Sequence, residues 1–122
     1  MRALIVDDSS FVRRHIRGLL ETRGIECDEA PNGLAGMERL RAGLSFDVAL
    51  VDWNMPEMTG IDMVRTLRSE GFSDLKVMMV TTEGESGMIQ CALEAGADEF
   101  LMKPFKKESL VEKLALMGLE DS

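Results

Sequence analysis

The most informative segment of the chain reads Val48-Ala49-Leu50-Val51-Asp52-Trp53-Asn54-Met55-Pro56. Its four consecutive aliphatic residues indicate a strand that is buried on both faces, because a half-exposed strand would alternate apolar and polar residues. Pro56 ends the run, since proline has no N–H group to donate to a continuing strand. We therefore predict a central strand of a parallel sheet over 48–51, followed directly by Asp52.

Short apolar runs and helical patterns alternate on both sides of this segment. The runs predict further strands at 4–6, 26–30, 77–80 and 100–102. Each strand is followed by a stretch in which apolar residues recur at helical spacing, and in the first stretch these are Val12, Ile16, Leu19 and Leu20. Five such β–α units predict an α/β fold, with a single five-stranded parallel sheet and helices on both of its faces.

The composition sets limits on the class of protein. The 122 residues fit one domain over 1–122, and 45% of them are hydrophobic. Lys and Arg total 14 against 22 Asp and Glu, and the resulting net charge of −8 disfavours binding to nucleic acids or anionic membranes. The aliphatic runs are too short to cross a bilayer, and no targeting segment is expected. Two isolated cysteines and one histidine fit a reducing cytoplasm and argue against a structural zinc site.

Polar residues follow four of the predicted strands, at the edge where functional groups gather in such sheets. They are Asp7 and Asp8 after the first strand, Asp52 after the third, Thr81 after the fourth and Lys103 after the fifth. Three neighbouring carboxylates repel one another and call for a cation, and oxygen ligands favour Mg²⁺ or Mn²⁺ over zinc. Lys103 and Thr81 suit phosphoryl oxygens, so Asp52 is the candidate nucleophile for an aspartyl phosphate.

Single members of this set also have ordinary structural explanations. Any one of Asp8, Ser9 and Ser10 could serve only to cap a helix, and Lys103 alone could be a solvated surface amine. His15 is interpreted as a solvated residue of the first helix rather than as a base. The set as a whole is far more specific than its members.

The order and spacing of these residues resemble the receiver domain of bacterial two-component response regulators. The similarity covers essentially the whole chain, and the segment 51–56 with Gly60 is similar to chemotaxis regulators of the CheY type. The resemblance implies the strand order 2-1-3-4-5 known for that family. It also implies that Asp52 accepts a phosphoryl group, that Asp8, Asp52 and the main-chain carbonyl of Asn54 bind Mg²⁺, and that Asp7 supports the metal.

The implied function is a stand-alone cytoplasmic switch that is catalytic only on itself. Its implied partners are a sensor histidine kinase of the chemotaxis type and a phosphorylation-dependent target such as the flagellar motor switch, with a phosphatase as a further candidate; a monomer is expected. Phe100 stands at the family's switch-aromatic position and ends the strand beside the one that Thr81 ends. Asn54 and Glu83 stand at two positions that tune the lifetime of the phosphoryl group, and the resemblance implies a cis peptide between Lys103 and Pro104.

Other functions stay open at this point. Within the family, the chain could be a phosphorelay intermediate, a regulator of a non-flagellar target, or a receiver that works without phosphorylation, although the complete polar set argues against the last. A flavodoxin would need a first loop that cradles phosphate, which Asp7 and Asp8 would repel. A phosphatase of the haloacid-dehalogenase type also forms an aspartyl phosphate, but it needs a second Asp where Asn54 stands, and an amide cannot shuttle a proton.

Overall fold

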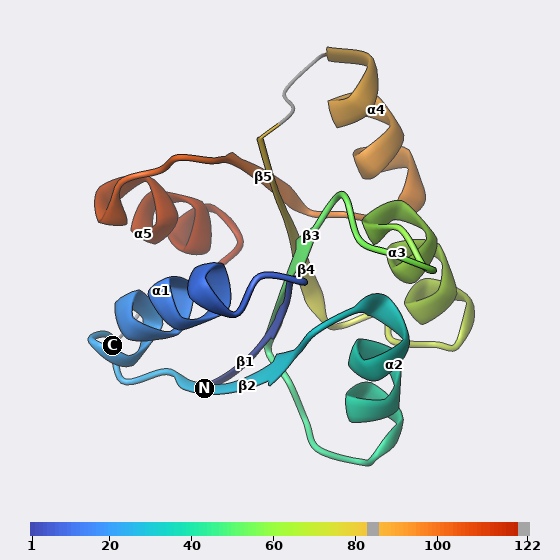
Figure 1. Ribbon diagram of the computed structural model, residues 1–122, viewed down its shortest axis with the longest axis horizontal. Helices are drawn as coiled ribbons and strands as arrows, with labels where there is room; N and C mark the ends of the chain where they lie inside the picture. The colour runs from blue at the N-terminus through green and yellow to red at the C-terminus, as the bar shows by residue number, and fades with distance from the viewer. Residues whose placement is uncertain (83–85, 120–122) are drawn as a thin grey trace.

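The computed structural model describes residues 1–82 and 86–119 and places a sheet between two layers of helices (Figure 1). The strands are β1 (Arg2–Val6), β2 (Glu26–Ala30), β3 (Val48–Asp52), β4 (Lys76–Thr81) and β5 (Glu99–Met102). The helices are α1 (Ser10–Glu21), α2 (Gly33–Arg41), α3 (Gly60–Ser69), α4 (Ser86–Ala95) and α5 (Lys107–Leu116). Within these residues, no helix has the length and apolar character needed to cross a membrane.

The sheet has the topology that the resemblance implies. All strand pairs are parallel, and the order is β2-β1-β3-β4-β5. β3 lies in the centre with all five residues buried, which confirms the prediction from the run 48–51. β3 and β4 extend further than predicted, because Asp52 and Thr81 are the last residues of their strands. The parallel register therefore brings the carboxyl ends of the central strands to one edge.

Two hydrophobic cores lie on opposite faces of the sheet. α2, α3 and α4 cover one face, on the right of Figure 1, and α1 and α5 cover the other. Strand residues alternate between these cores, so Met79 and Phe100 belong to the first core, whereas Val80 and Leu101 belong to the second. Methionine fills interior space in both cores, and four of these side chains are almost completely buried: Met37, Met63, Met78 and Met79.

Side-chain caps fix where three helices begin. The N-cap residues of α1, α2 and α3 are Ser9, Asn32 and Thr59, and each side chain accepts a hydrogen bond from a backbone N–H three residues further on. Such caps satisfy N–H groups that the helix itself leaves unpaired. The cap of α1 is therefore Ser9 and not Asp8, which leaves the Asp8 carboxylate available for another role.

Candidate functional site

Three carboxylates meet at the carboxyl edge of the sheet. Oxygens of Asp7, Asp8 and Asp52 all lie within 4.8 Å of one another. Asp7 and Asp52 are only 2% and 8% exposed, whereas Asp8 is open to solvent. The parallel pairing of Val6 with Val51 explains the convergence, because it sets the ends of β1 and β3 side by side. The structure thus brings together the three acids that the sequence selected.

Lys103 joins this cluster from the far end of the chain. Its Nζ lies 2.8 Å from Asp7 Oδ2 and 3.3 Å from Asp52 Oδ1. Its backbone N–H donates to the carbonyl oxygen of Thr81 at 2.7 Å, which ties the end of β5 to the end of β4. The peptide between Lys103 and Pro104 is cis, as the resemblance implied. Lys103 is therefore part of the cluster rather than a solvated surface amine.

The charges of the cluster do not balance. Burial raises the pKa of Asp52 above its ordinary value, and the charge of Asp7 raises it further, while Lys103 opposes both. Burial alone would lower the pKa of Lys103, but its bonds to Asp7 and Asp52 outweigh burial and hold that pKa above its usual value. Three ionised carboxylates and one ammonium leave two negative charges uncompensated, which a divalent cation would neutralise.

The donor atoms of the site fit Mg²⁺. They are carboxylate oxygens, which hard divalent ions prefer, and the cluster contains no thiolate or imidazole. Asp8 is exposed, and among the described residues its side chain makes no hydrogen bond or ion pair. One exposed carboxylate beside two buried ones suits an ion that keeps several of its waters. No other group of three or more acidic, His or Cys side chains in the described parts of the chain is placed to hold a metal.

A glycine allows the segment after Asp52 to return against the end of β3. A Cβ atom on Gly60 would lie 2.3 Å from the carbonyl oxygen of Asp52, a distance that real Cβ atoms essentially never show. The N–H of Gly60 donates to the carbonyl oxygen of Trp53 at 2.9 Å and closes the loop. Asn54 lies in this loop with an exposed side chain, and Glu57 adopts a positive φ of 69°.

Thr81 and Phe100 occupy neighbouring strands, but not in the predicted way. Thr81 ends β4 and is 1% exposed. Phe100 does not end β5: it pairs with Met79, and Met102 is the residue opposite Thr81. The placement of Phe100 at the strand end was therefore wrong, whereas the predicted strand 100–102 agrees with β5 (Glu99–Met102), in which Phe100 is the second residue. Phe100 is 8% exposed and packs in the core under α2, α3 and α4, on the face to which Met79 points.

The remaining residues that the sequence analysis considered are the histidine, Glu83 and the two cysteines. His15 is exposed on α1, as predicted, and its ring centroid lies 5.9 Å from that of Phe105. Glu83 lies outside the described residues. Cys27 is buried and Cys91 is exposed, and both are free thiols.

Two residues beside the site were missed by the sequence analysis. Arg13 donates a hydrogen bond from Nη1 to the main-chain oxygen of Asp7 at 2.6 Å. Phe11 is 77% exposed, and it lines a pocket of about 430 Å³ together with Lys103 and Phe105. A signal for Phe11 was present, since it lies outside the apolar stripe of the first helix. No sequence pattern shows which of many surface arginines reaches a main-chain oxygen.

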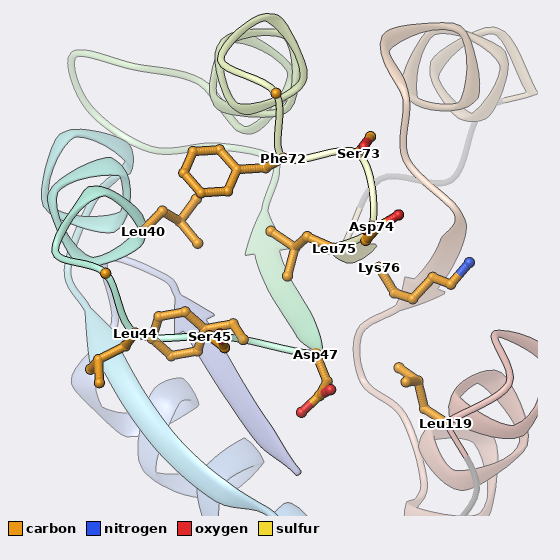
Figure 2. Close-up of a pocket in the computed structure, with 13 residues that line it drawn as sticks. Leu40, Leu44, Ser45, Asp47, Phe72, Ser73, Asp74, Leu75, Lys76 and Leu119 are labelled. Carbon is orange, nitrogen blue, oxygen red and sulfur yellow. The ribbon is translucent and has the colours of Figure 1, made fainter.

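A second pocket lies at the opposite edge of the sheet. It has a volume of about 480 Å³, and Figure 2 shows Leu40, Phe72 and Leu75 around it. Asp47, which also lines it, accepts a hydrogen bond from the N–H of Arg2 at 2.8 Å. The lining of this pocket includes none of the clustered acids, so the candidate chemistry belongs to the carboxyl edge.

Comparison with known proteins settles the family. Residues 3–115 match the family model of the response regulator receiver domain. The chain belongs to this family. It is 41% identical to the chemotaxis protein CheY1 of Helicobacter pylori, over 99% of this chain and all of the relative. A CheY homolog of Campylobacter jejuni is 40% identical, over 93% of this chain and 89% of the relative.

A solved structure supports the same relationship. The chemotaxis protein CheY4 of Vibrio cholerae superposes with a TM-score of 0.88 at 32% identity, over 93% of this chain and 95% of that one. Receiver domains of the CheY type are regulators rather than classical enzymes, and phosphorylation on an aspartate is general for the family. Receiver domains bind Mg²⁺ at an acidic pocket, and Asp7, Asp8 and Asp52 form a cluster that could hold it.

Proposed function

We propose that residues 1–122 form a receiver domain that acts in the cytoplasm as a chemotaxis regulator and accepts a phosphoryl group on Asp52 in a Mg²⁺-dependent step. The donor is a sensor histidine kinase, and the result is altered binding to a target such as the flagellar motor switch. One observation carries the proposal: Lys103 Nζ contacts both Asp7 and Asp52 inside a carboxylate cluster with excess negative charge. The excess negative charge favours a bound cation, and the ammonium can donate hydrogen bonds to the oxygens of an incoming phosphoryl group.

Each group at the site has a role in the proposed transfer. An Asp52 carboxylate oxygen attacks phosphorus, the bond from phosphorus to a histidine nitrogen of the donor breaks, and the released imidazole takes up a proton from water. The Lys103 ammonium and the Thr81 hydroxyl donate hydrogen bonds to the phosphoryl oxygens. Asp8, Asp52 and the main-chain carbonyl of Asn54 would hold Mg²⁺, with Asp7 in support, and the bound ion supplies positive charge opposite the phosphoryl oxygens.

The surface beside the site supports a protein as the phosphoryl donor. Phe11 projects into solvent near the start of α1, and the pocket that it shares with Phe105 also includes Lys103. A donor that presents a phosphohistidine to Asp52 must approach this same edge of the sheet. An exposed aromatic side chain there offers it apolar contact area.

The proposed switch couples Asp52 to the surface of α4, β5 and α5. The phosphoryl oxygens draw the Thr81 hydroxyl toward Asp52, and the space behind Thr81 is filled by Phe100, which lies on the same face of the sheet. A pocket of about 720 Å³ on this surface is lined by residues that include Phe100 and Met102. Asn54 and Glu83 tune the lifetime of the phosphoryl group through the approach of the attacking water.

A labelling experiment tests the proposal. Incubation with a small acyl phosphate and Mg²⁺ should label the protein, and Asp52→Asn should abolish labelling. Asp62→Asn is the matched control, because Asp62 is an exposed carboxylate at the start of α3, in the helix that follows the same loop. Equal labelling of the parent and of Asp52→Asn would overturn the assignment.

A pull-down with phosphorylated and unphosphorylated protein then identifies the target. Recovery of a flagellar switch component only with the phosphorylated form supports the chemotaxis function. Recovery of a histidine phosphotransfer protein instead supports a phosphorelay intermediate, and an unrelated partner supports a regulator of a non-flagellar target.

A further inference from the structure

The β1–α1 loop carries two of the three clustered carboxylates, and one arginine of α1 holds its backbone. Arg13 donates from Nη1 to the main-chain oxygen of Asp7 at 2.6 Å. Its Nε donates to Glu29 Oε1 on β2 at 3.0 Å. Only 15% of the Arg13 side chain is exposed, so water screens these charge-assisted bonds weakly. Arg13 thus connects the loop to the neighbouring strand.

The carbonyl that Arg13 binds belongs to the peptide group between Asp7 and Asp8. A rotation of this peptide would turn the backbone of Asp8 and redirect its side chain. Asp7 is held at its other side as well: its N–H donates to the Ala30 carbonyl at 3.2 Å, and its Oδ1 accepts from the Ser9 N–H at 2.9 Å. Because the Asp8 side chain has no bond of its own among the described residues, its direction depends on the main chain.

We infer that Arg13 is a positioning residue for the metal-binding carboxylates, because its bond to the Asp7 carbonyl fixes the peptide that aims Asp8 at Asp52. The inference rests on the proposed function in one respect, namely that the acidic cluster binds Mg²⁺. Among the described residues, Arg13 makes no hydrogen bond or ion pair with the side chains of Asp7, Asp8 or Asp52, because its bonds go to the Asp7 main-chain oxygen and to Glu29. Its effect is on the affinity for the ion, and it acts through the loop.

The chain offers a matched control one helical turn further along. Arg17 donates from Nη1 to Glu29 Oε2 at 2.7 Å, so it binds the other oxygen of the same carboxylate. Its remaining hydrogen bond goes to Glu21, four residues along the same helix. Removing Arg17 therefore deletes a comparable ion pair between α1 and β2 and leaves the bond to the Asp7 carbonyl in place.

The experiment compares Arg13→Ala, Arg13→Lys and Arg17→Ala in titrations with Mg²⁺, followed by the fluorescence of Trp53, which adjoins Asp52. We expect Arg13→Ala to raise the Kd for Mg²⁺ about tenfold. Arg17→Ala should change it by less than about twofold. Arg13→Lys should lie between them, since a single ammonium cannot replace both bonds of a guanidinium. Phosphorylation of Arg13→Ala by an acyl phosphate should be slow at low Mg²⁺ and return close to the parent's rate at saturation.

Two results would overturn the inference: an unchanged Kd in Arg13→Ala, or an equal loss of affinity in Arg17→Ala. Thermal unfolding of each variant is measured alongside, and if Arg13→Ala does not fold, the Kd of Arg13→Lys decides the matter. The proposed function fails separately. A parent protein that binds Mg²⁺ and accepts no phosphoryl group contradicts that function, while the comparison of Kd values still tests Arg13.

Discussion

Gly60→Ala probes how closely the start of α3 packs against Asp52, the proposed phosphorylation site. The new methyl group would lie 2.3 Å from the Asp52 carbonyl oxygen and 3.0 Å from Cα of Trp53. Ordinary van der Waals contact begins at 3.4 Å. The methyl group would also lie 2.8 Å from Cε of Met79, which can rotate away, but the two backbone atoms cannot, so the end of β3 or the start of α3 must move by about 1 Å.

Two consequences follow from this displacement. Overpacking of a close-packed interior costs about 1–3 kcal/mol, so we expect the free energy of unfolding to fall by about 2 kcal/mol. In the proposed transfer Asp52 carries the attacking oxygen, and a shift of about 1 Å in a reacting group can cost about 100-fold in rate. The rate constant for phosphorylation by an acyl phosphate should therefore fall about 100-fold in Gly60→Ala.

Urea unfolding followed by Trp53 fluorescence measures the first effect, and a time course of labelling at fixed Mg²⁺ measures the second. Gly18→Ala is the control, since it adds the same methyl group to α1, where nothing lies within 4 Å. That variant should be more stable than the parent by up to about 1 kcal/mol, with an unchanged rate. A Gly60→Ala protein that is phosphorylated at the parent's rate would refute the reasoning, even if its stability had fallen.

Three further predictions concern the site. Asp8→Ala should weaken Mg²⁺ binding about tenfold, because it removes the exposed carboxylate of the cluster; an unchanged midpoint in the Trp53 fluorescence titration would contradict this. Asp52→Asn should raise the free energy of unfolding at neutral pH, because burial, and then the charge of Asp7, raise the pKa of Asp52 in the folded protein. Above that folded pKa, ionisation of Asp52 lowers the free energy of unfolding of the parent, and this cost disappears as the pH falls through the pKa. Urea unfolding should therefore show that the stability advantage of Asp52→Asn shrinks in acid. A constant advantage would argue against this cause. Thr81→Ala should accept the phosphoryl group normally yet lose most of the resulting gain in affinity for the target found by pull-down, and a gain equal to the parent's would show that another residue transmits the change.

The sequence predicted those parts of the molecule that depend on local pattern. The run 48–51 identified the central strand because a strand covered by helices on both faces is apolar throughout. Parallel strands all end at the same edge of a sheet, so the sequence could place together the polar residues at these strand ends, which are Asp7, Asp8, Asp52, Thr81 and Lys103.

Features that depend on distances between elements were not predictable in this way. The bond from Arg13 to Asp7 requires the exact tilt of α1 over β1, and the sequence carries no sign of it. The need for glycine at position 60 arises from the 2.3 Å approach to the Asp52 carbonyl, which no composition or spacing reveals. The strand was predicted over 100–102, but that Phe100 pairs with Met79, and Met102 with Thr81, depends on the register between β4 and β5, which the sequence does not show.

The position of Lys103 has a consequence for the synthesis of the protein. Its ammonium bridges Asp7 and Asp52, which precede it by 96 and 51 residues in the chain. A nascent chain that has emerged from the ribosome only as far as β4 already contains all three acids but not this amine. The cluster is thus completed only when β5 and Lys103 have been made, and a product truncated after β4 holds the three acids without the ammonium that bridges two of them.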